Sequence, residues 1–359
     1  MDLHIIARGW SMKKIVLTGG GTAGHITPNL SLIPNLEKNF EIFYLGEKNS
    51  LEERLVSKFI NVKFIPINAV KFVRKISFKN LLIPFKLNSY IKQVQKILQE
   101  IKPDVIFAKG GYVSIPVVLA GSKLNVPILA HESDLSMGLA NKIILRKCKI
   151  MFTSFRETCI SDKCIYSGSP IRDEIFYGNK ENARKICGFR DNKKTIMFFG
   201  GSAGAKSIND FVFKNIDMFS DYNIIHIVGK DNKNQLKKDN YFQIEYAYNI
   251  YDFYKLADVV ICRAGSNSIY ELLAVKKPMI LIPLPKTQSR GDQIENAEAF
   301  RKNGYAKVIL QENLTTENLL TEIEDCFINK EKIIEKMQEY KPLNANKIIL
   351  DYILRFSDL

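Results

Sequence analysis

The chain has 359 residues, of which 46% are hydrophobic and 25% charged, and its formal net charge is +14. This length predicts two domains of about 150–180 residues, and the composition is that of a globular enzyme. No run reaches the roughly 18 apolar residues that a membrane-spanning helix needs. A basic chain favours nucleic acid, anionic lipid or a phosphorylated substrate as partner, but coding bias towards lysine, asparagine and isoleucine would also give this charge.

Neither a secretory signal nor a zinc site is expected. Residues 1–11 (MDLHIIARGWS) hold too short an apolar stretch for a signal, and Met12 resembles a second start, so we treat 1–11 as an extension outside the fold. The six cysteines form no C-x-x-C pair, and four histidines give no zinc spacing. Scattered thiols fit a reducing cytoplasm.

Short runs rich in Val, Ile and Phe alternate with longer amphipathic segments, which predicts strands of parallel α/β sheets covered on both faces. In the first half the expected strands are 14–18, 41–45, 104–108, 127–130, 149–153 and 164–167. In the second half they are 195–199, 223–228, 243–246, 258–262, 278–283 and 306–310. Six and six predict two doubly wound domains with a linker within 168–194, followed by C-terminal helices over 330–359.

The first expected strand runs into a glycine loop in which Gly19, Gly21 and Gly24 satisfy G-x-G-x-x-G. Such a loop brings backbone N–H groups and a helix N-terminus close to a phosphate. The motif alone also fits a dinucleotide site, with Glu47 as ribose ligand, or tight strand–helix packing without a ligand. His25 closes the loop, and His131 and Glu132 follow another strand; we expect all three in loops at the carboxyl edge of the sheet.

The second domain repeats this arrangement at Gly200-Gly201-Ser202-Ala203-Gly204. The sequence also reads G-x-S-x-G, the nucleophile elbow of hydrolases. His226 is the histidine that follows Ser202, only 24 residues later, which disfavours a serine hydrolase. A loop that binds pyrophosphate is the simpler interpretation. Two such loops predict a cleft between the domains, with a donor on one side and an acceptor on the other.

Polar residues follow two further strands of the second domain. Glu271 lies in the first turns of an expected helix, where its carboxylate suits ribose hydroxyls; a capping box with Ser268 is the alternative without a ligand. Asp292 and Gln293 suit sugar hydroxyls, or form an acidic helix start. The sequence contains no D-x-D pair, so a metal bridging nucleotide phosphates is not indicated and no cofactor is expected.

Together these residues resemble one family, the peptidoglycan N-acetylglucosaminyltransferases of the MurG type. Gly20–Pro28 is similar to the family's GGTGGHxxP loop, and Gly200–Ala205 with Asn209 to its GGSxGA…N loop. The remaining matching segments are His131-Glu132 with Gly138-Leu139 and Asn141-Lys142, Gly168–Arg172, Arg263–Gly265 with Glu271, and Asp292-Gln293 with Asn296-Ala297. The match is collinear from about 12 to 310. Three positions depart from the pattern: Ala23 replaces a glycine, Ser133-Asp134 a Gln-Asn pair, and Ser169 an Asn.

The resemblance implies a GT-B fold, with two Rossmann-like domains facing a cleft. It assigns 12–168 to acceptor and membrane binding, 169–340 to the UDP-sugar, and 341–359 to a helix packing back on the first domain. It also implies transfer of N-acetylglucosamine from UDP-N-acetylglucosamine, with inversion, to the 4-hydroxyl of lipid-linked muramyl pentapeptide. Cell-wall synthesis and division proteins are possible partners, and nucleic acid is not expected.

The resemblance also implies site residues. Donor-binding positions are Thr22, Ala23, Gly24, Asp134, Asn141, Arg172, Ser202, Ala203, Gly204, Ala247, Arg263, Ala264, Gly265, Glu271, Asp292 and Gln293. Acceptor-binding positions are Gly20, Gly21, Thr22, Gly24, His25 and Glu132. Inversion requires a base, and His25 suits this role because imidazole titrates near neutral pH; its alternative role is acceptor binding alone. Arg263 and helix N-termini can stabilise the departing UDP.

Residues 70–87 (VKFVRKISFKNLLIPFKL) combine apolar and basic side chains. Their apolar members are Phe72, Ile76, Phe78, Leu81, Leu82 and Phe85. Such a segment suits the surface of an anionic bilayer, and a core-facing helix is the alternative. A lipid-linked acceptor requires such a face, so we expect peripheral attachment to anionic lipid on the cytoplasmic face of the cell membrane.

Three other functions remain open. A UDP-N-acetylglucosamine 2-epimerase of the same fold shares the donor site but needs no membrane segment. An NAD-dependent dehydrogenase uses only the first glycine loop. A nucleic-acid-binding protein needs neither loop, and its binding would weaken steeply with salt.

Overall fold

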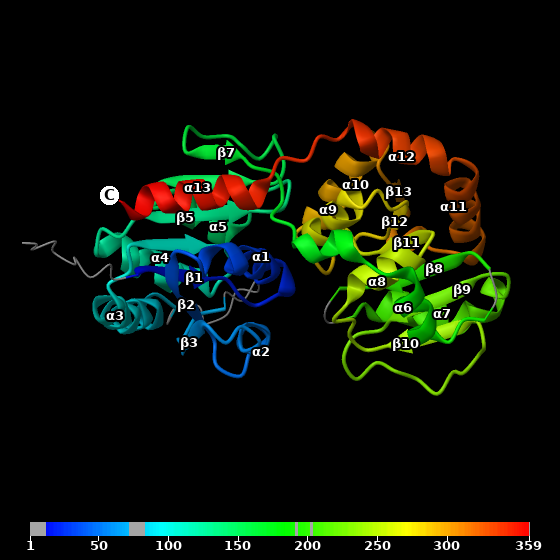
Figure 1. Cartoon of the computed structure of the whole chain (residues 1–359), viewed down its shortest axis with the longest axis horizontal. Coiled ribbons are helices and arrows are strands. Elements are labelled where there is room, and N and C mark those ends of the chain that lie inside the picture. The colour runs from blue at the N-terminus through cyan, green and yellow to red at the C-terminus, as the bar shows by residue number, and fades with distance from the viewer. Residues whose placement is uncertain (1–11, 72–82, 191–192, 202–203, 359) are drawn as a thin grey trace, which may run out of the picture.

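The computed structural model describes residues 12–71, 83–190, 193–201 and 204–358 and contains two parallel sheets (Figure 1). The first sheet has the order β3-β2-β1-β4-β5-β6-β7 and the second β10-β9-β8-β11-β12-β13. In both, the strand order reverses beside the first strand of the domain. Because the carboxyl ends on either side of this reversal leave a crevice, each sheet provides a ligand-binding edge.

The N-terminal sheet consists of β1 (Lys13–Thr18), β2 (Phe40–Gly46), β3 (Val62–Pro66), β4 (Val105–Ala108), β5 (Ile128–Glu132), β6 (Ile150–Thr153) and β7 (Cys164–Tyr166). Its helices are α1 (Thr27–Leu36), α2 (Leu51–Val56), α3 (Ile83–Ile101), α4 (Ser114–Lys123) and α5 (Leu139–Leu145). Helices α3, α4 and α5 bury their apolar sides against one face of the sheet. The opposite face is covered by α1 and by the last helix of the chain, α13 (Ala345–Ser357).

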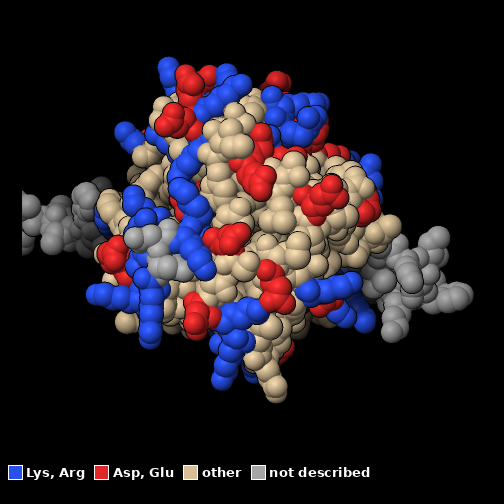
Figure 2. All heavy atoms as spheres, turned by 90° about the vertical axis from the view of Figure 1, so that its right-hand side faces the viewer, with Lys and Arg blue, Asp and Glu red and all other residues tan. Residues whose placement is uncertain are grey.

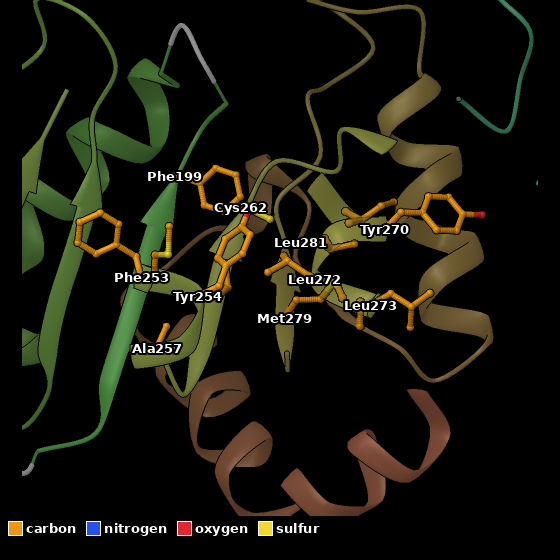
Figure 3. Packing of buried hydrophobic residues seen from close by; sticks show 14 of the residues in the cluster. Phe199, Phe253, Tyr254, Ala257, Cys262, Tyr270, Leu272, Leu273, Met279 and Leu281 are labelled. Carbon is orange, nitrogen blue, oxygen red and sulfur yellow. The ribbon is translucent and has the colours of Figure 1, made fainter. Parts of the chain in front are cut away.

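The C-terminal sheet consists of β8 (Thr195–Phe199), β9 (Asn223–Ile227), β10 (Tyr241–Ile244), β11 (Val259–Cys262), β12 (Met279–Leu281) and β13 (Lys307–Val308). Its helices are α6 (Lys180–Cys187), α7 (Lys206–Asn215), α8 (Ile250–Leu256), α9 (Ser266–Ala274), α10 (Asp292–Lys302), α11 (Thr316–Ile328) and α12 (Lys330–Glu339). On one face, Tyr254 of α8 packs beside Phe199 and Cys262 of neighbouring strands (Figure 3). Helices α7 and α11 cover the other face.

The twelve predicted strands are all present, with ends shifted by at most two residues. The additional strand, β3, lies at the sheet edge, where the exposed residues Lys63 and Pro66 weaken the apolar signal. The predicted linker over 168–194 was too long. Ile175 of the 3-10 helix η3 (Asp173–Tyr177) and Ala183 of α6 are buried in the C-terminal core, so the chain crosses between the domains before Asp173.

The chain returns to the N-terminal domain at its end. Helix α13 lies across the N-terminal sheet (red in Figure 1), and its Ile349 and Ile353 are fully buried there. Asn346 donates a 2.7 Å hydrogen bond to the Ile171 carbonyl, and Ser31 of α1 donates one of 3.4 Å to Asn346. The domains are therefore joined by two chain segments.

The outer end of the C-terminal domain carries charges of both signs (Figure 2). Basic and acidic side chains are interspersed with uncharged ones across this face. The face seen in Figure 2 is therefore not a continuous basic surface of the kind that nucleic acid requires. Among the described residues, no helix has the length and hydropathy needed to cross a membrane.

Candidate active site

Neighbouring side chains pack closely against the backbone of the first glycine loop. Gly21 has φ +86°, and a Cβ atom there would lie 2.7 Å from the Tyr112 ring. A Cβ atom on Gly20 would lie 2.4 Å from the buried Glu52 carboxylate. The positive φ and the adjacent ring favour glycine at position 21, and a Cβ atom at position 20 would also lie 2.9 Å from Val113 Cγ2. The loop ends in a short 3-10 turn, Ala23–His25, where the Thr22 hydroxyl lies 3.0 Å from His25 Nδ1.

His25 is held as a neutral imidazole. Its ring is half-buried, and burial together with the Lys109 charge lowers its pKa to about 4, against an opposing effect of Glu132. At neutral pH the ring is unprotonated and can accept a proton. Besides the Thr22 hydroxyl at Nδ1, the Gly20 backbone also hydrogen-bonds the ring.

The prediction that His131 and Glu132 lie in a loop was wrong. Both are buried at the end of β5, and His131 Nε2 lies 3.2 Å from the Gly168 carbonyl oxygen. Glu132 accepts hydrogen bonds from the backbone N–H groups of Asp134 and Gly138, each 3.0 Å long, and one of 2.9 Å from Asn141. Glu132 and Asn141 therefore shape the 132–141 loop, and any ligand contact of their side chains would be additional to this role.

Ser133 and Asp134 join the two domains. Asp134 accepts a 2.9 Å hydrogen bond from Arg290 and one of 3.0 Å from Asn296. Ser133 donates a 3.1 Å hydrogen bond to Asn267 of α9, whose amide donates one of 3.0 Å to the Gly24 carbonyl. The predicted donor ligand Asp134 thus lies at the cleft, but its carboxylate already bridges the domains.

In the C-terminal domain, Glu271 takes no part in capping its own helix. Helix α9 begins at Ser266 after Gly265, so Ser268 is no N-cap and the capping-box alternative is wrong. Glu271 instead accepts a 3.0 Å hydrogen bond from Arg172. The predicted donor-binding position Ala247 follows β10 and lies in sequence between Tyr246 and Tyr248, whose rings meet edge to face with centroids 4.9 Å apart. Lys58 of the other domain lies 3.6 Å above the Tyr248 ring.

Arg263 is engaged by the protein itself. Its guanidinium donates to the carbonyls of Ile282 (3.0 Å) and Pro283 (3.2 Å), and to Ser207 (2.7 Å) and Gln311 (2.6 Å). These four bonds fix the carboxyl end of β12 against α7. The arrangement favours a positioning role for Arg263 over the predicted direct contact with phosphate.

The remaining predicted donor residues sit at helix starts. Ala264 is buried just before Gly265, and Asp292 and Gln293 begin α10 after Gly291, whose φ is +92°. Asp292 lies 3.3 Å from Arg290, and Gln293 accepts a 3.0 Å hydrogen bond from the Leu284 N–H.

The second glycine loop is described only in part, because Ser202 and Ala203 lie outside the described residues. Gly204 has φ +77°, and a Cβ atom there would lie 2.1 Å from the Val228 carbonyl oxygen. Among the described residues, no group of three His, Cys, Asp or Glu side chains could hold a metal ion.

Family models match both halves of the chain. The glycosyltransferase family 28 N-terminal domain matches residues 15–153, and the family 28 C-terminal domain matches residues 195–351. The chain belongs to glycosyltransferase family 28.

Similar proteins place it more narrowly within family 28. A Clostridium botulinum (strain Kyoto / Type A2) protein named UDP-N-acetylglucosamine–N-acetylmuramyl-(pentapeptide) pyrophosphoryl-undecaprenol N-acetylglucosamine transferase is 44% identical over 96% of this chain and 100% of its own. A Clostridium tetani protein of the same name is 43% identical over 96% and 98%. The chain is therefore an N-acetylglucosaminyltransferase of the MurG type, as the resemblance implied.

Solved structures agree on the fold. MurG of Acinetobacter baumannii superimposes with a TM-score of 0.72 at 23% identity, covering 96% of this chain and 99% of that one. A Neisseria meningitidis UDP-GlcNAc 2-epimerase gives 0.66 at 16% identity, covering 96% and 100%. The predicted GT-B architecture, two Rossmann-like domains across a cleft, is confirmed.

Several residues of the candidate active site were not predicted from the sequence. Lys109, Asn267 and Arg290 all contact the predicted residues or their neighbours at the cleft. Lys109 directly follows β4, Asn267 lies in the first turn of α9 and Arg290 directly precedes Gly291, and the local sequence gives no signal for a site role at these positions.

Proposed function

We propose that the protein transfers N-acetylglucosamine from UDP-N-acetylglucosamine to the 4-hydroxyl of undecaprenyl-pyrophosphoryl-muramyl-pentapeptide, converting lipid I into lipid II. The observation that carries this proposal is the 44% identity across the full length of a relative named for this transfer. The two glycine loops, brought to one cleft by the paired sheets, support it.

The proposed reaction is a single inverting displacement. The acceptor oxygen forms a bond to C1 of the donor sugar as the bond between C1 and the UDP oxygen breaks. The His25 imidazole takes the hydroxyl proton, and UDP leaves with the bonding electron pair. A neutral imidazole suits the first task, and the diphosphates of both substrates raise its basicity as they bind.

We place the donor at the C-terminal edge of the cleft. Glu271 binds the ribose, the backbone at Ala247 meets the uracil, and Asp292 and Gln293 bind the sugar. Arg172 and the N-termini of α7 and α9 stabilise the departing diphosphate, because their positive ends point to the carboxyl edge of the sheet. We propose that no metal ion is needed for this step.

The acceptor lies on the Gly20–His25 loop, and we propose that the lipid is reached from an anionic membrane surface on the cytoplasmic side. Phe85, in the first turn of α3, is 76% exposed, with Lys86 beside it also exposed. The other predicted membrane residues, Phe72, Ile76, Phe78, Leu81 and Leu82, lie outside the described residues. An exposed aromatic ring beside basic side chains suits an anionic interface.

Transfer is tested with radiolabelled UDP-N-acetylglucosamine and a short-chain lipid I analogue in EDTA. Label in the lipid product supports both the transfer and its metal independence. Transfer that returns only with magnesium contradicts metal independence alone. Epimerised UDP-sugar without labelled lipid would favour the 2-epimerase reaction named for a structural neighbour.

Membrane attachment is tested by co-sedimentation with vesicles containing phosphatidylglycerol. Phe85→Ser combined with Lys86→Ser is expected to reduce the bound fraction several-fold, because an apolar contact and roughly 1 kcal/mol of charge attraction are lost. Ile328→Ser, at an 82% exposed residue of the other domain, is the matched control. Equal loss in both variants contradicts the proposed membrane face.

A further inference from the structure

Lys109 is a buried lysine without a carboxylate partner. It follows the last residue of β4 and is 1% exposed. Its Nζ donates a 2.7 Å hydrogen bond to the Ser133 hydroxyl, and within the described part of the chain no carboxylate oxygen lies within 4.0 Å of it. Buried ammonium groups are normally paired, because an unpaired charge in the interior is costly. The Lys109 charge is therefore not neutralised at contact distance.

This charge lies against the His25 loop. The Lys109 N–H donates a 2.8 Å hydrogen bond to Thr18, the last residue of β1. A Cβ atom on Gly19 would lie 3.0 Å from Lys109 Cβ and 2.2 Å from the His25 carbonyl oxygen. One on Gly111 would lie 3.2 Å from His25 Nδ1. The segment around Lys109 thus packs against the loop at its start and at the imidazole.

We propose that Lys109 is a positioning residue whose buried ammonium, held by Ser133 next to the Gly19–His25 loop, disfavours protonation of the His25 imidazole and so extends to lower pH the range in which His25 can take the proton of the acceptor hydroxyl. The inference rests on the proposed role of His25 as base. Lys109 itself touches no reacting atom in this scheme. It acts through space, by making a second positive charge at the loop unfavourable.

The other charged groups around the ring do not cancel this effect. Burial is the largest cause of the low His25 pKa, and Lys109 is the largest contribution from a charge. Arg290 acts in the same direction and Glu132 in the opposite one. Burial also lowers the pKa of Lys109 to about 8, opposed by Glu132 and Asp134. Lys109 is therefore charged through neutral pH, and its influence fades above about pH 8.

The test is an NMR titration of the histidine C2 protons in the full-length protein without substrate. Lys109→Met removes the charge at similar length, and Lys109→Gln removes it while keeping a group that can bond Ser133. Both are expected to raise the His25 midpoint by about one pH unit. Lys109→Arg keeps the charge and is expected to leave the midpoint near the wild-type value. His25→Gln identifies the resonance among the four histidines.

Lys277 offers a matched control. Burial lowers its pKa to about 8 as well, but its ammonium bonds the Ala257 carbonyl in the C-terminal domain, away from the cleft loop. Lys277→Met is expected to leave the His25 midpoint unchanged. A shift as large as in Lys109→Met would show a general effect of charge removal and overturn the inference.

Transfer assays complete the test. In both neutral variants the acid limb of the kcat/KM profile is expected to move upward with the His25 midpoint, with little change near pH 8. An unchanged midpoint in folded Lys109→Met and Lys109→Gln overturns the inference, whatever the activity. If wild-type protein transfers no sugar, the proposed function fails, while the titration still decides the relation of Lys109 to His25.

Discussion

The half-buried Arg172 and the buried Glu271 form an ion pair with 3.0 Å between Nη2 and Oε1, although 99 positions separate them in the chain. Burial raises the pKa of Glu271, and the Arg172 guanidinium opposes this. In the free protein the two charges compensate each other. A bound nucleotide would offer ribose hydroxyls to the Glu271 carboxylate and phosphates to the Arg172 guanidinium. Each side chain would then bind a group of the ligand in place of the other.

Glu271→Gln is expected to weaken UDP binding by about 10- to 100-fold, because it removes a charged acceptor and leaves Arg172 without its counter-charge. Isothermal titration calorimetry with UDP measures this directly. The matched control is Glu298→Gln on α10, where the carboxylate pairs with Arg301 on the surface. Unchanged affinity in Glu271→Gln would remove Glu271 from the nucleotide site.

Asp134 is expected to make stability depend on pH. Burial and the Glu132 charge raise its pKa from 3.8 to about 6. Since the folded value lies above the unfolded one, the folded state binds more protons between them, and this group's contribution to the free energy of unfolding increases as pH falls from about 7 towards 4. Urea unfolding at several pH values should show this increase in the free energy of unfolding in wild type but not in Asp134→Asn.

The effect of Asp134 is measured as the difference in free energy of unfolding between wild type and Asp134→Asn. Taking the difference is necessary because burial lowers the pKa of His131 and His226, so that these residues destabilise the folded state as pH falls. Asp351→Asn, on the exposed side of α13, serves as control. If the wild-type and Asp134→Asn curves stay parallel from pH 7 to 5, Asp134 does not carry the effect.

Asn209→Ala is expected to lower the free energy of unfolding by about 1–3 kcal/mol, because it leaves buried groups without hydrogen-bond partners. Its amide donates a 2.7 Å hydrogen bond to the Val228 carbonyl, and its Oδ1 lies 3.0 Å from His226 Nε2. Denaturant unfolding measures the change. Asn303→Ala, whose exposed amide bonds Ala299, should cost clearly less; equal costs would contradict a special role for the buried amide.

Ile349→Ala in α13 is expected to cost about 2–5 kcal/mol, the usual range for emptying a fully buried aliphatic site. The loss should appear in the N-terminal domain, whose core contains this side chain. Hydrogen exchange of β1 and β4 would locate it. Ile328→Ala, exposed on α11, is the control, and protection lost only in the C-terminal sheet would speak against the packing of α13.

The alternation of apolar runs was sufficient to predict the fold, because strands covered on both faces leave a strong local signal. Strand β3 was not predicted because an edge strand has fewer buried apolar positions. The linker was misjudged because α6 has a polar surface, and its one fully buried residue, Ala183, gives little periodic signal.

The sequence predicted only those positions of the candidate site that belong to a local motif. Gly20, Gly21, His25 and Glu271 lie at the cleft edges where strand order and motif spacing placed them. The engagement of Arg263 by carbonyls and of Asp134 by Arg290 depends on contacts between segments far apart in sequence. Local pattern carries no information about such contacts, and the same holds for the buried charge of Lys109.

The return of α13 to the first domain has a consequence for synthesis on the ribosome. The N-terminal core contains Ile349 and Ile353, so the part of its apolar face that α13 covers stays exposed until this helix has been synthesised. The C-terminal domain, whose elements end at Glu339, can close its own core earlier. The domain made first is thus completed last, and its transiently exposed apolar surface is prone to aggregation during that interval.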